Sequence, residues 1–450
     1  MSFGDTIVAP RRQIFVPDEY LERKDIPPNE RAISCKWVYR IKENDDSSLR
    51  YKARLVFCGF EQTECGEAFA PVPKLPTIRM LFALAASHDW DIWQMDVVTA
   101  FLHPTIDENV YMELPEAYGE SNGMPGAGHA KVGSGRYVCK LKQALYGLKQ
   151  APRAWYSDID KYLTQTLHFR RSELDANLYI MQDLHLLLWV DDILLFALAT
   201  SPTTSASDSP VQRVKGQLST KYRMKDLGEA KSFIGIQIER DRPKLIVRLH
   251  QQKHIEGILD TFGMTACNGL NVPLDRSIKL ISTASTESTE LNGDDITRYQ
   301  SIVGKLIYAM IATRPDLAFA VSTLGRFNAA PNTSHLEAAK KTFRYLRRTS
   351  NVGLMYSPTS SNGKSNELIG FCDSDWAGDL DSRRSTTGYV FMISNGAISW
   401  KSRRQQTVAL SSTEAEYMAV TDASKEGIWL RSLYRKLSCG IHPSNPNNRS

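Results

Sequence analysis

Alternation of apolar and polar residues predicts short strands along much of the chain, and helical periodicity predicts helices between them. The expected strands cover residues 35–42, 49–59, 90–102, 184–198 (as a hairpin), 233–240, 243–249, 368–372, 387–394 and 397–401. The expected helices cover residues 77–87, 138–156, 211–222, 299–314, 318–327, 335–348 and 414–437. Helices and strands mixed in this way predict an α/β (α+β) fold.

The most informative stretch is residues 184–198, LHLLLWVDDILLFAL, which sets Asp191 and Asp192 between two apolar runs. Burying an unpaired carboxylate costs several kcal/mol. A chain therefore keeps two acids there when they project from an exposed turn, or when cations meet them. The first alternative is the tip of an ordinary hairpin. The second is a site for divalent cations that serve phosphoryl transfer.

Asp96 is the candidate for a third carboxylate in such a site. It lies at the end of an apolar, strand-like run and precedes a turn at Thr99-Ala100-Phe101. Active sites on open sheets form at the carboxyl ends of core strands, which favours a functional carboxylate here. The competing interpretation of Asp96 is a helix N-cap.

The composition is that of a globular protein, with 42% hydrophobic and 23% charged residues among 450. This length allows two or three domains. No apolar run is long enough to span a membrane, and residues 1–12 do not have the pattern of a secretory signal, so we expect an intracellular protein. The seven cysteines form no CxxC pair, which favours reduced thiols over a disulfide framework or a zinc site.

The net charge of +5 decides little, but its distribution favours a nucleic-acid partner. Residues 121–157 contain no Asp or Glu, and their cations alternate with aromatic side chains, as suits a phosphate backbone. The cations of this stretch are Lys131, Arg136, Lys140, Lys142, Lys149 and Arg153. A solvated basic face without a partner is the alternative.

Two further basic faces are expected. Lys52 and Arg54 are two residues apart on a strand and so share one face of the first hairpin, which could close over a triphosphate. Helical spacing places Lys340, Arg344 and Arg347 on one face of the helix at 335–348, suited to contact a duplex backbone. Simple surface charge explains either set equally well.

Ten segments resemble, in the family's order, the reverse transcriptase and RNase H portion of copia-type LTR retrotransposon Pol polyproteins. They are CKWVYRIK, YKARLVFCGF, QMDVVTAFLHPTIDENVYMELPE, LKQALYGLKQAPRAWY, WVDDILLF, MKDLGEAKSFIGIQIERD, YQSIVGKLIYAMIATRPDLAFAVS, FCDSDWAGD, RRSTTGYVF and LSSTEAEYMA. The resemblance implies a right-hand polymerase fold with palm, fingers and thumb, followed by an incomplete RNase H-like domain.

The resemblance implies a two-metal polymerase site. Asp96, Asp191 and Asp192 match carboxylates that hold two Mg²⁺ ions, or Mn²⁺, during nucleotidyl transfer. Phe101 matches an aromatic residue that excludes a ribose 2′-hydroxyl. Trp189 stands where the family usually has Tyr, and Val98 where lysine is common.

The resemblance also assigns residues to the substrates. Lys52 and Arg54 match a fingers strand that clamps the triphosphate, and Phe233-Ile234-Gly235 resembles a hairpin that grips the primer end. The nucleotide-binding set implied is Lys52, Arg54, Phe101, Tyr146, Gly147 and Gln150. The primer and template set is Pro152, Arg153, Phe233, Ile234, Gly235, Lys340, Arg344 and Arg347.

Asp373 and Glu416 match the first two metal-binding acids of an RNase H site. The later acids of the family's site fall after Ser450, and Asp422 and Glu426 lie on the same helix as Glu416 and cannot replace them. We therefore expect no RNase H activity from this chain.

The expected organisation runs in sequence order. It comprises an irregular segment at 1–33, a reverse transcriptase domain at 34–272, a linker at 273–297, connection helices at 298–365 and a truncated RNase H-like domain at 366–450. The expected function is RNA- and DNA-directed DNA synthesis. The expected partners are an RNA template, a DNA primer, an RNA–DNA hybrid and dNTPs, with no membrane and with the integrase and protease parts absent from this chain. The expected location is cytoplasmic particles or the nucleus. The alternative is a decayed or repurposed copy that binds nucleic acid without catalysis.

Overall fold

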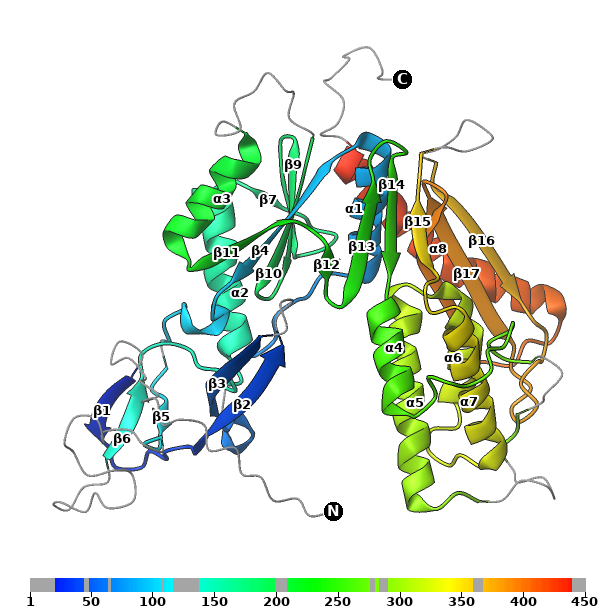
Figure 1. The fold of residues 1–450 in the computed structure, drawn as a ribbon, viewed down its shortest axis with the longest axis horizontal. Coiled ribbons are helices and arrows are strands. Elements are labelled where there is room, and N and C mark those ends of the chain that lie inside the picture. The colour runs from blue at the N-terminus through cyan, green and yellow to red at the C-terminus, as the bar shows by residue number, and fades with distance from the viewer. Residues whose placement is uncertain are drawn as a thin grey trace, which may run out of the picture. The chain divides into compact units, whose positions relative to one another are not determined.

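The computed structural model describes residues 21–43, 48–63, 66–106, 108–115, 137–198, 209–275, 280–282, 290–358 and 367–438 (Figure 1). Helices and strands are mixed along the chain, as the α/β (α+β) prediction requires. The chain forms two compact units. Unit 1 comprises residues 1–72, 96–169 and 216–225, and unit 2 comprises 73–95, 170–215 and 226–450. Each unit combines segments that are distant in the sequence.

Unit 1 contains a two-stranded hairpin and a small three-stranded sheet. The hairpin pairs β2 (Cys35–Glu43) with β3 (Leu49–Phe57), as predicted. The sheet has the order β1-β6-β5, formed by Leu21–Asp25, Tyr137–Leu141 and Tyr111–Met112. Helix α2 (Ala151–Lys161) follows, with Pro152 in its first turn, where the missing N–H of proline costs nothing.

Two expectations for this unit were wrong. Strand β1 lies inside the segment expected to be irregular, because its pairing partner is β6, more than a hundred residues away. The helix expected at 138–156 does not begin until Ala151: β6 and a series of turns precede it. Gly147 has a φ of 92°, which an α-helix cannot accommodate.

A six-stranded sheet carries the core of the chain's first half, with the order β11-β4-β10-β9-β8-β7. Helix α1 (Leu75–His88) contributes a nearly continuous run of fully buried residues to the same hydrophobic cluster as these strands. The strands are β4 (Asp91–Val97), β7 (Arg170–Arg171), β8 (Leu178–Met181), β9 (Leu184–Trp189), β10 (Asp192–Ala197) and β11 (Met224–Glu229), and α3 (Pro210–Lys221) precedes β11.

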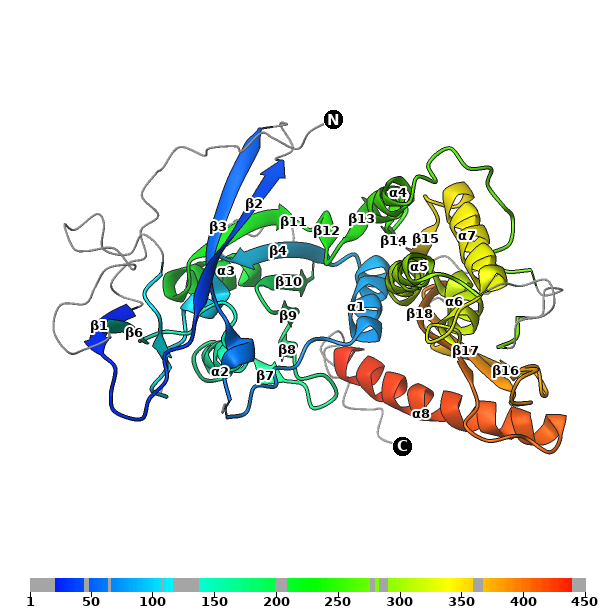
Figure 2. The ribbon, with the colours of Figure 1, turned by 90° about the horizontal axis from the view of Figure 1, so that it is seen from below.

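A four-stranded sheet, β12-β13-β14-β15, and a bundle of helices continue unit 2 (Figure 2). The helices share a second hydrophobic core, and a capping box between Asn332 and His335 begins α7. The sheet strands are Ser232–Phe233, Ile236–Asp241, Ile246–His250 and Gly353–Tyr356, and the helices α4 to α7 are Gln252–Thr261, Gly293–Ala312, Ala318–Gly325 and Thr333–Arg348.

The last part of unit 2 is a three-stranded antiparallel sheet covered on one face by a long helix (Figure 2). It comprises β16 (Ile369–Ser374), β17 (Thr386–Ile393), β18 (Gly396–Arg404) and α8 (Ser412–Ser438). The hairpin predicted around Asn395-Gly396 is present, but its two turn residues are Ser394 and Asn395, with φ of 50° and 63°. Both values are positive, as in a type I′ turn.

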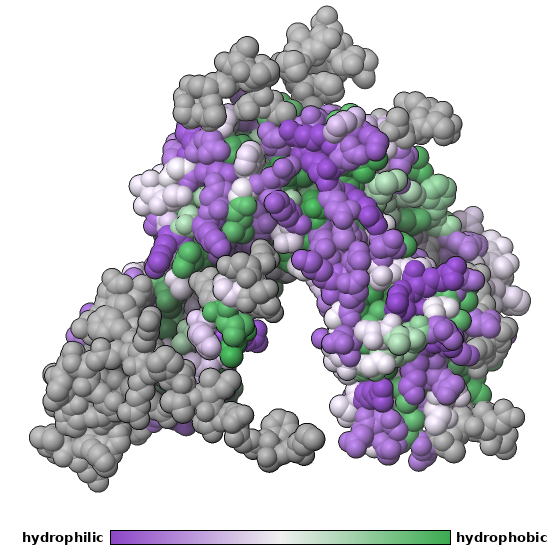
Figure 3. Space-filling model, viewed as in Figure 1, coloured by the Kyte–Doolittle hydropathy of each residue, from purple (hydrophilic) through white to green (hydrophobic). Residues whose placement is uncertain are grey.

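Ion pairs cover the hairpin β13–β14, which is strongly hydrophilic in the space-filling view (Figure 3). Arg240 donates to Asp89 at 2.7 Å, and Glu239 accepts from Arg248 at 3.1 Å. Among the helices that the structure describes, none combines the length and apolar character needed to cross a membrane.

Candidate active site

Asp191 and Asp192 lie at the tip of the hairpin β9–β10. The register pairs Trp189 with Asp192, so Val190 and Asp191 form the turn. The leucines on either side are fully buried, whereas both aspartates are partly exposed. The turn therefore lifts two carboxylates out of an apolar core, and this resolves the burial problem posed by the sequence.

The turn is strained at Val190, whose φ of 56° is unfavourable for a β-branched residue. Strain of this kind costs of order 1–3 kcal/mol and is concentrated at functional sites. Beside it, Asp192 Oδ1 accepts a hydrogen bond of 3.2 Å from Gln94 Nε2. Gln94 is buried on β4 and was not singled out from the sequence, because its partner Asp192 is 98 residues away along the chain.

Asp96 lies on β4 between the buried residues Met95 and Val97 and is partly exposed. The N-cap interpretation is wrong, because the N-cap of the short 3₁₀ helix Ala100–Leu102 is Thr99. Within the sheet, β4 is the neighbour of β10, the strand that begins with Asp192. The boundary between the compact units falls between Met95 and Asp96, so Asp96 and the Asp191–Asp192 pair belong to different units.

The chemistry of these side chains suits a hard cation. Carboxylate oxygens are the ligands that Mg²⁺ and Mn²⁺ prefer, and Asp191 and Asp192 offer them from adjacent positions. In the part of the chain that the structure describes, no group of three or more His, Cys, Asp and Glu side chains is placed to hold one ion. The Asp191–Asp192 pair thus supplies the donor type without a complete ligand set.

The nucleotide-binding residues expected from the resemblance gather in unit 1. The Phe101 and Tyr146 rings contact each other edge to face, with centroids 5.3 Å apart, and the Arg54 guanidinium lies 5.4 Å from the Tyr146 centroid. Gln150 is buried and accepts from Gln62 Nε2 at 2.9 Å. Lys52 lies on β3 opposite Arg40, but its side chain is outside the described part.

Gly147 allows a close backbone approach beside this cluster. Its φ is 92°, and a Cβ atom there would lie 2.0 Å from the carbonyl oxygen of Phe57. The adjacent hydrogen bond, 2.7 Å from Phe57 N to Tyr146 O, holds the 57–59 and 146–147 segments together. Only glycine fits, so the Tyr146-Gly147 turn fixes the place of the Tyr146 ring.

Pro152 and Arg153 lie in the first turn of α2. Arg153 forms an ion pair of 3.1 Å with Glu67, and both side chains are substantially exposed. Exposed pairs contribute roughly 0–1 kcal/mol, so Arg153 can exchange this partner for a phosphate at little cost.

Ile234 and Gly235, with φ of 45° and 78°, form the tight turn between β12 and β13, and Phe233 is the last residue of β12. The Phe233 ring is buried against Trp189, with centroids 6.3 Å apart, and Tyr308 Oη donates to the carbonyl of Ile234. Trp189 therefore connects this turn to the tip that carries Asp191 and Asp192. The sequence did not reveal this role, because the two segments are more than forty residues apart.

The cations of α7 are partly engaged within the protein. Arg344 Nε donates to Asn268 O at 2.7 Å, and Arg347 Nε donates to Thr265 O at 2.6 Å. These bonds fasten the segment after α4 to the helix. Lys340 is partly exposed on the same helix.

Asp373 on β16 and Glu416 on α8 lie near each other in the last part of unit 2. Asp373 is exposed on β16, and the next residue, Ser374, donates its N–H to Glu416 Oε1 at 3.4 Å. Asp373 also lines a pocket of about 830 Å³ together with Asp375. Asp422 pairs with Arg403 at 2.8 Å, and Glu426 accepts from Ser399 at 2.6 Å, so both of these acids serve the domain's own structure.

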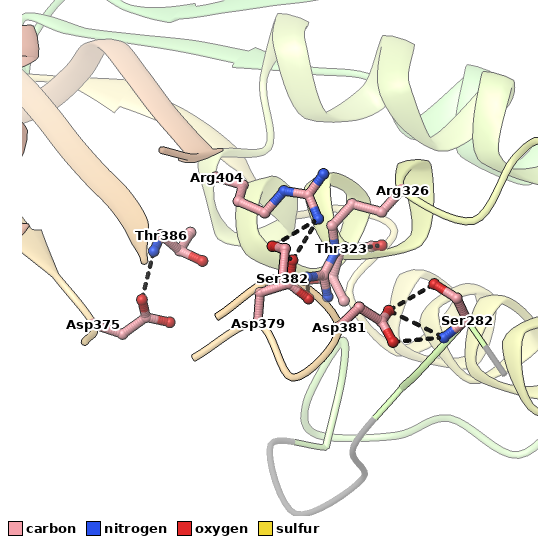
Figure 4. A network of polar contacts seen from close by, with 9 residues as sticks. All are labelled: Ser282, Thr323, Arg326, Asp375, Asp379, Asp381, Ser382, Thr386 and Arg404. Carbon is pink, nitrogen blue, oxygen red and sulfur yellow. Dashed lines mark hydrogen bonds and ion pairs between the residues drawn. The ribbon is translucent and has the colours of Figure 1, made fainter. Parts of the chain in front are cut away.

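A buried carboxylate that the sequence did not reveal organises the loop after β16 (Figure 4). Asp379 is 2% exposed and pairs with Arg326 at 2.8 Å and with Arg404, while Ser382 donates to it at 2.6 Å. Burial would raise the pKa of Asp379, but the hydrogen bonds from Ser382 and Arg404 and the charge of Arg326 bring it below its usual range. The nearby Asp381 accepts from Ser282, which also ties this loop to a distant segment.

Comparison of the sequence with known proteins identifies the family of this chain. Residues 20–276 match the family model described as reverse transcriptase (RNA-dependent DNA polymerase). The chain is 40% identical over 433 residues to the retrovirus-related Pol polyprotein from transposon TNT 1-94 of Nicotiana tabacum, covering 93% of this chain and 30% of that protein. It is 36% identical over 428 residues to the one from transposon RE1 of Arabidopsis thaliana, covering 93% of this chain and 27% of that protein.

The putative transposon Ty5-1 protein of Saccharomyces cerevisiae is 33% identical over 342 residues, which are 74% of this chain and all of that protein. Among solved structures, the foamy viral protease-reverse transcriptase in complex with RNA/DNA hybrid has a TM-score of 0.44 and 11% identity, covering 87% of this chain and 42% of that one. The chain spans less than a third of the length of each of these two plant polyproteins. From the family match and these identities, the chain belongs to the reverse transcriptase family and, within it, to the copia-type retrotransposon Pol polyproteins.

Proposed function

We propose that this chain is an RNA-directed, and also DNA-directed, DNA polymerase that uses Asp96, Asp191 and Asp192. The observation that carries the proposal is the strained turn at Val190, which presents two adjacent, partly exposed carboxylates on a leucine-rich hairpin next to the strand of Asp96. An ordinary hairpin tip has no need of a β-branched residue at positive φ. Membership of the reverse transcriptase family supports the same conclusion.

Asp96, Asp191 and Asp192 would hold the divalent ions. Bound there, two such ions supply Lewis-acid stabilisation to the attacking and leaving oxygens of an in-line displacement. The chain's own contribution is placement. Gln94 orients the Asp192 carboxylate through a hydrogen bond from its amide, and the leucines of the hairpin are buried in the core behind the tip.

The cluster in unit 1 is proposed to bind the incoming dNTP. The Phe101 ring, held edge to face by Tyr146, would leave no room for a ribose 2′-hydroxyl. Arg54 and Lys52, on strand β3, would meet the triphosphate. Phe233, Ile234 and Gly235 are proposed to position the primer end, and Pro152, Arg153 and α7 the template and duplex.

Asp373 and Glu416 are proposed to be a vestigial RNase H site. Among the described residues only these two match the family's acids, and two acids are too few for the two-ion arrangement that hydrolysis of a phosphodiester requires. We therefore expect this chain to leave the RNA of a hybrid intact.

Primer extension tests the main proposal. The purified chain receives an oligo(dT)-primed poly(rA) template with dTTP and Mg²⁺ or Mn²⁺, beside D191N, which keeps the shape of the side chain but removes its charge. Extension by the native chain that D191N lacks supports the polymerase. Extension that survives in D191N would refute the assignment of the 191–192 tip.

The competing function is nucleic-acid binding without catalysis. Native chain that binds the hybrid with a steep salt dependence but adds no nucleotide with either metal would favour it. A labelled RNA strand in the same hybrid reports RNase H activity, and its cleavage would contradict the vestigial assignment.

A further inference from the structure

The carbonyl groups at the end of helix α5 are bound by side chains from two other elements. The last four carbonyls of an α-helix have no partner within the helix. Arg79 on α1 donates from Nη1 to the carbonyls of Ile311 and Ala312, at 2.8 and 3.2 Å. Trp400 on β18 donates from Nε1 to the carbonyl of Met310 at 3.1 Å, and the Arg79 guanidinium lies 3.8 Å from the centroid of its ring. Because Arg79 is buried, these contacts fix the end of α5 on a rigid base.

One turn before this end, Tyr308 contacts the turn that is proposed to position the primer end. Its hydroxyl donates to the carbonyl of Ile234. His254 on α4 packs edge to face against the Tyr308 ring, with centroids 4.8 Å apart, and so helps to fix the direction of the ring. A Cβ atom at Gly235 would lie 2.9 Å from the Tyr308 oxygen. The hydroxyl therefore fits closely against a turn that has no side chain at this point.

The turn at residues 234–235 depends on support of this kind. Ile234 is β-branched and has a φ of 45°, a strained conformation that persists only where the surroundings hold it. Gly235 is exposed and Ile234 is half-buried, so the tip of the turn lies outside the core. Phe233, directly before the turn, is buried and contacts the Trp189 ring, two residues before Asp191. A displacement of the turn is thus passed to the side of the carboxylate tip.

We propose that Tyr308 is a positioning residue for primer extension. Its hydroxyl holds the 234–235 turn, and with it the primer end, in place relative to Asp191 and Asp192. This role rests on the proposed polymerase function, and Tyr308 acts through the turn without touching the reacting atoms. Since Trp400 fixes the end of α5 from strand β18, the last sheet supports DNA synthesis whether or not its own acids have any activity.

The variant Y308F tests this role because it removes the hydroxyl and keeps the ring. Y299F is the matched control. Tyr299 lies on the same helix, is fully buried and donates to the carbonyl of Leu324 at 2.7 Å. Each variant loses one hydrogen bond to a backbone carbonyl, but only Y308F loses a contact with the 234–235 turn. Urea unfolding should show that Y299F costs at least as much stability, because its hydroxyl lies deeper in the core.

Single-turnover extension of an oligo(dT)-primed poly(rA) template measures the catalytic effect. For Y308F, the rate of addition at saturating dTTP should fall by about tenfold, because a misplacement of about 1 Å is enough to slow a reaction by up to about a hundredfold. The dTTP concentration for half of the maximal rate, and the Kd of the hybrid from fluorescence anisotropy, should stay at their native values. Hydrogen–deuterium exchange of residues 232–236 gives a readout independent of catalysis. It should be faster in Y308F, and Y299F should match the native chain in every one of these measurements.

The outcomes separate this role from the proposed function. Native extension with equal rates in Y308F and Y299F, or unchanged exchange of the turn in Y308F, would overturn the role of Tyr308 and leave the polymerase assignment standing. A Y308F chain that binds dTTP or the hybrid more weakly but adds nucleotides at the native rate would also overturn it, since the effect would then lie in binding. A native chain that extends no primer would overturn the proposed function and this role with it.

Discussion

Replacement of Gly147 by alanine is the sharpest test of how unit 1 builds its candidate nucleotide pocket. The new Cβ would lie 2.0 Å from the Phe57 carbonyl oxygen, which belongs to the backbone and cannot rotate away. The φ of 92° is also unfavourable for any side chain. Relief therefore requires the 146–147 turn to separate from the end of β3, with loss of the bond from Phe57 N to Tyr146 O.

Both effects can be given a magnitude. A left-handed conformation costs an L-residue roughly 1–2 kcal/mol. A methyl group forced into filled space costs about 1–3 kcal/mol more. The free energy of unfolding should thus fall by about 2–5 kcal/mol, a large part of the stability of a small domain.

Two other glycines separate these contributions. Gly228 has a φ of 75° and no atom within 4 Å of a built Cβ, so G228A should show the conformational cost alone. Gly216 lies in α3 with equally open space, so G216A should stabilise the protein by roughly 0.5–1 kcal/mol. Urea unfolding followed by circular dichroism compares the three variants. A G147A chain that loses no more stability than G228A would refute the packing argument.

Three further predictions concern specificity and pH. F101A should let primer extension accept rNTPs, because the ring that meets the sugar is gone; the ratio of rTTP to dTTP incorporation measures this, and an unchanged ratio would contradict the role. D379N should lower the free energy of unfolding by about 3 kcal/mol at pH 7, because it leaves Arg326 and Arg404 around a neutral group. The folded-state pKa of Asp379 is below the unfolded value of 3.8, so the stability that the ionised carboxylate contributes is present above pH 3.8 and is lost as the pH falls. Urea unfolding at pH 7 and at pH 3 measures this loss, and the difference in the free energy of unfolding between the two pH values should be smaller for D379N than for the native chain. His185 is 4% exposed, and burial lowers its pKa from 6.5 to about 4. The free energy of unfolding should therefore fall by about 3 kcal/mol as the pH is lowered from 6.5 to 4. H185F should lack this pH dependence in the same urea titrations.

The sequence by itself determined the local elements and the family. The alternation of apolar and polar residues predicted the hairpin β2–β3, and the run LHLLLWVDDILLFAL predicted a hairpin with two acids at its tip. Both patterns involve residues that are close together in the sequence. Helices α5, α7 and α8 were predicted for the same reason. The ordered motifs identified the reverse transcriptase family, since their residues match at fixed places.

The tertiary structure alone decided what depends on distant segments. Strand β1 is extended because β6 lies beside it, and Gly147 breaks the expected helix because its backbone touches Phe57. Asp379 looks like one more loop acid until Arg326 and Arg404 enclose it. Pairing partners and burial are properties of the folded chain, and a pattern read along one stretch carries no information about which distant stretch will pack against it.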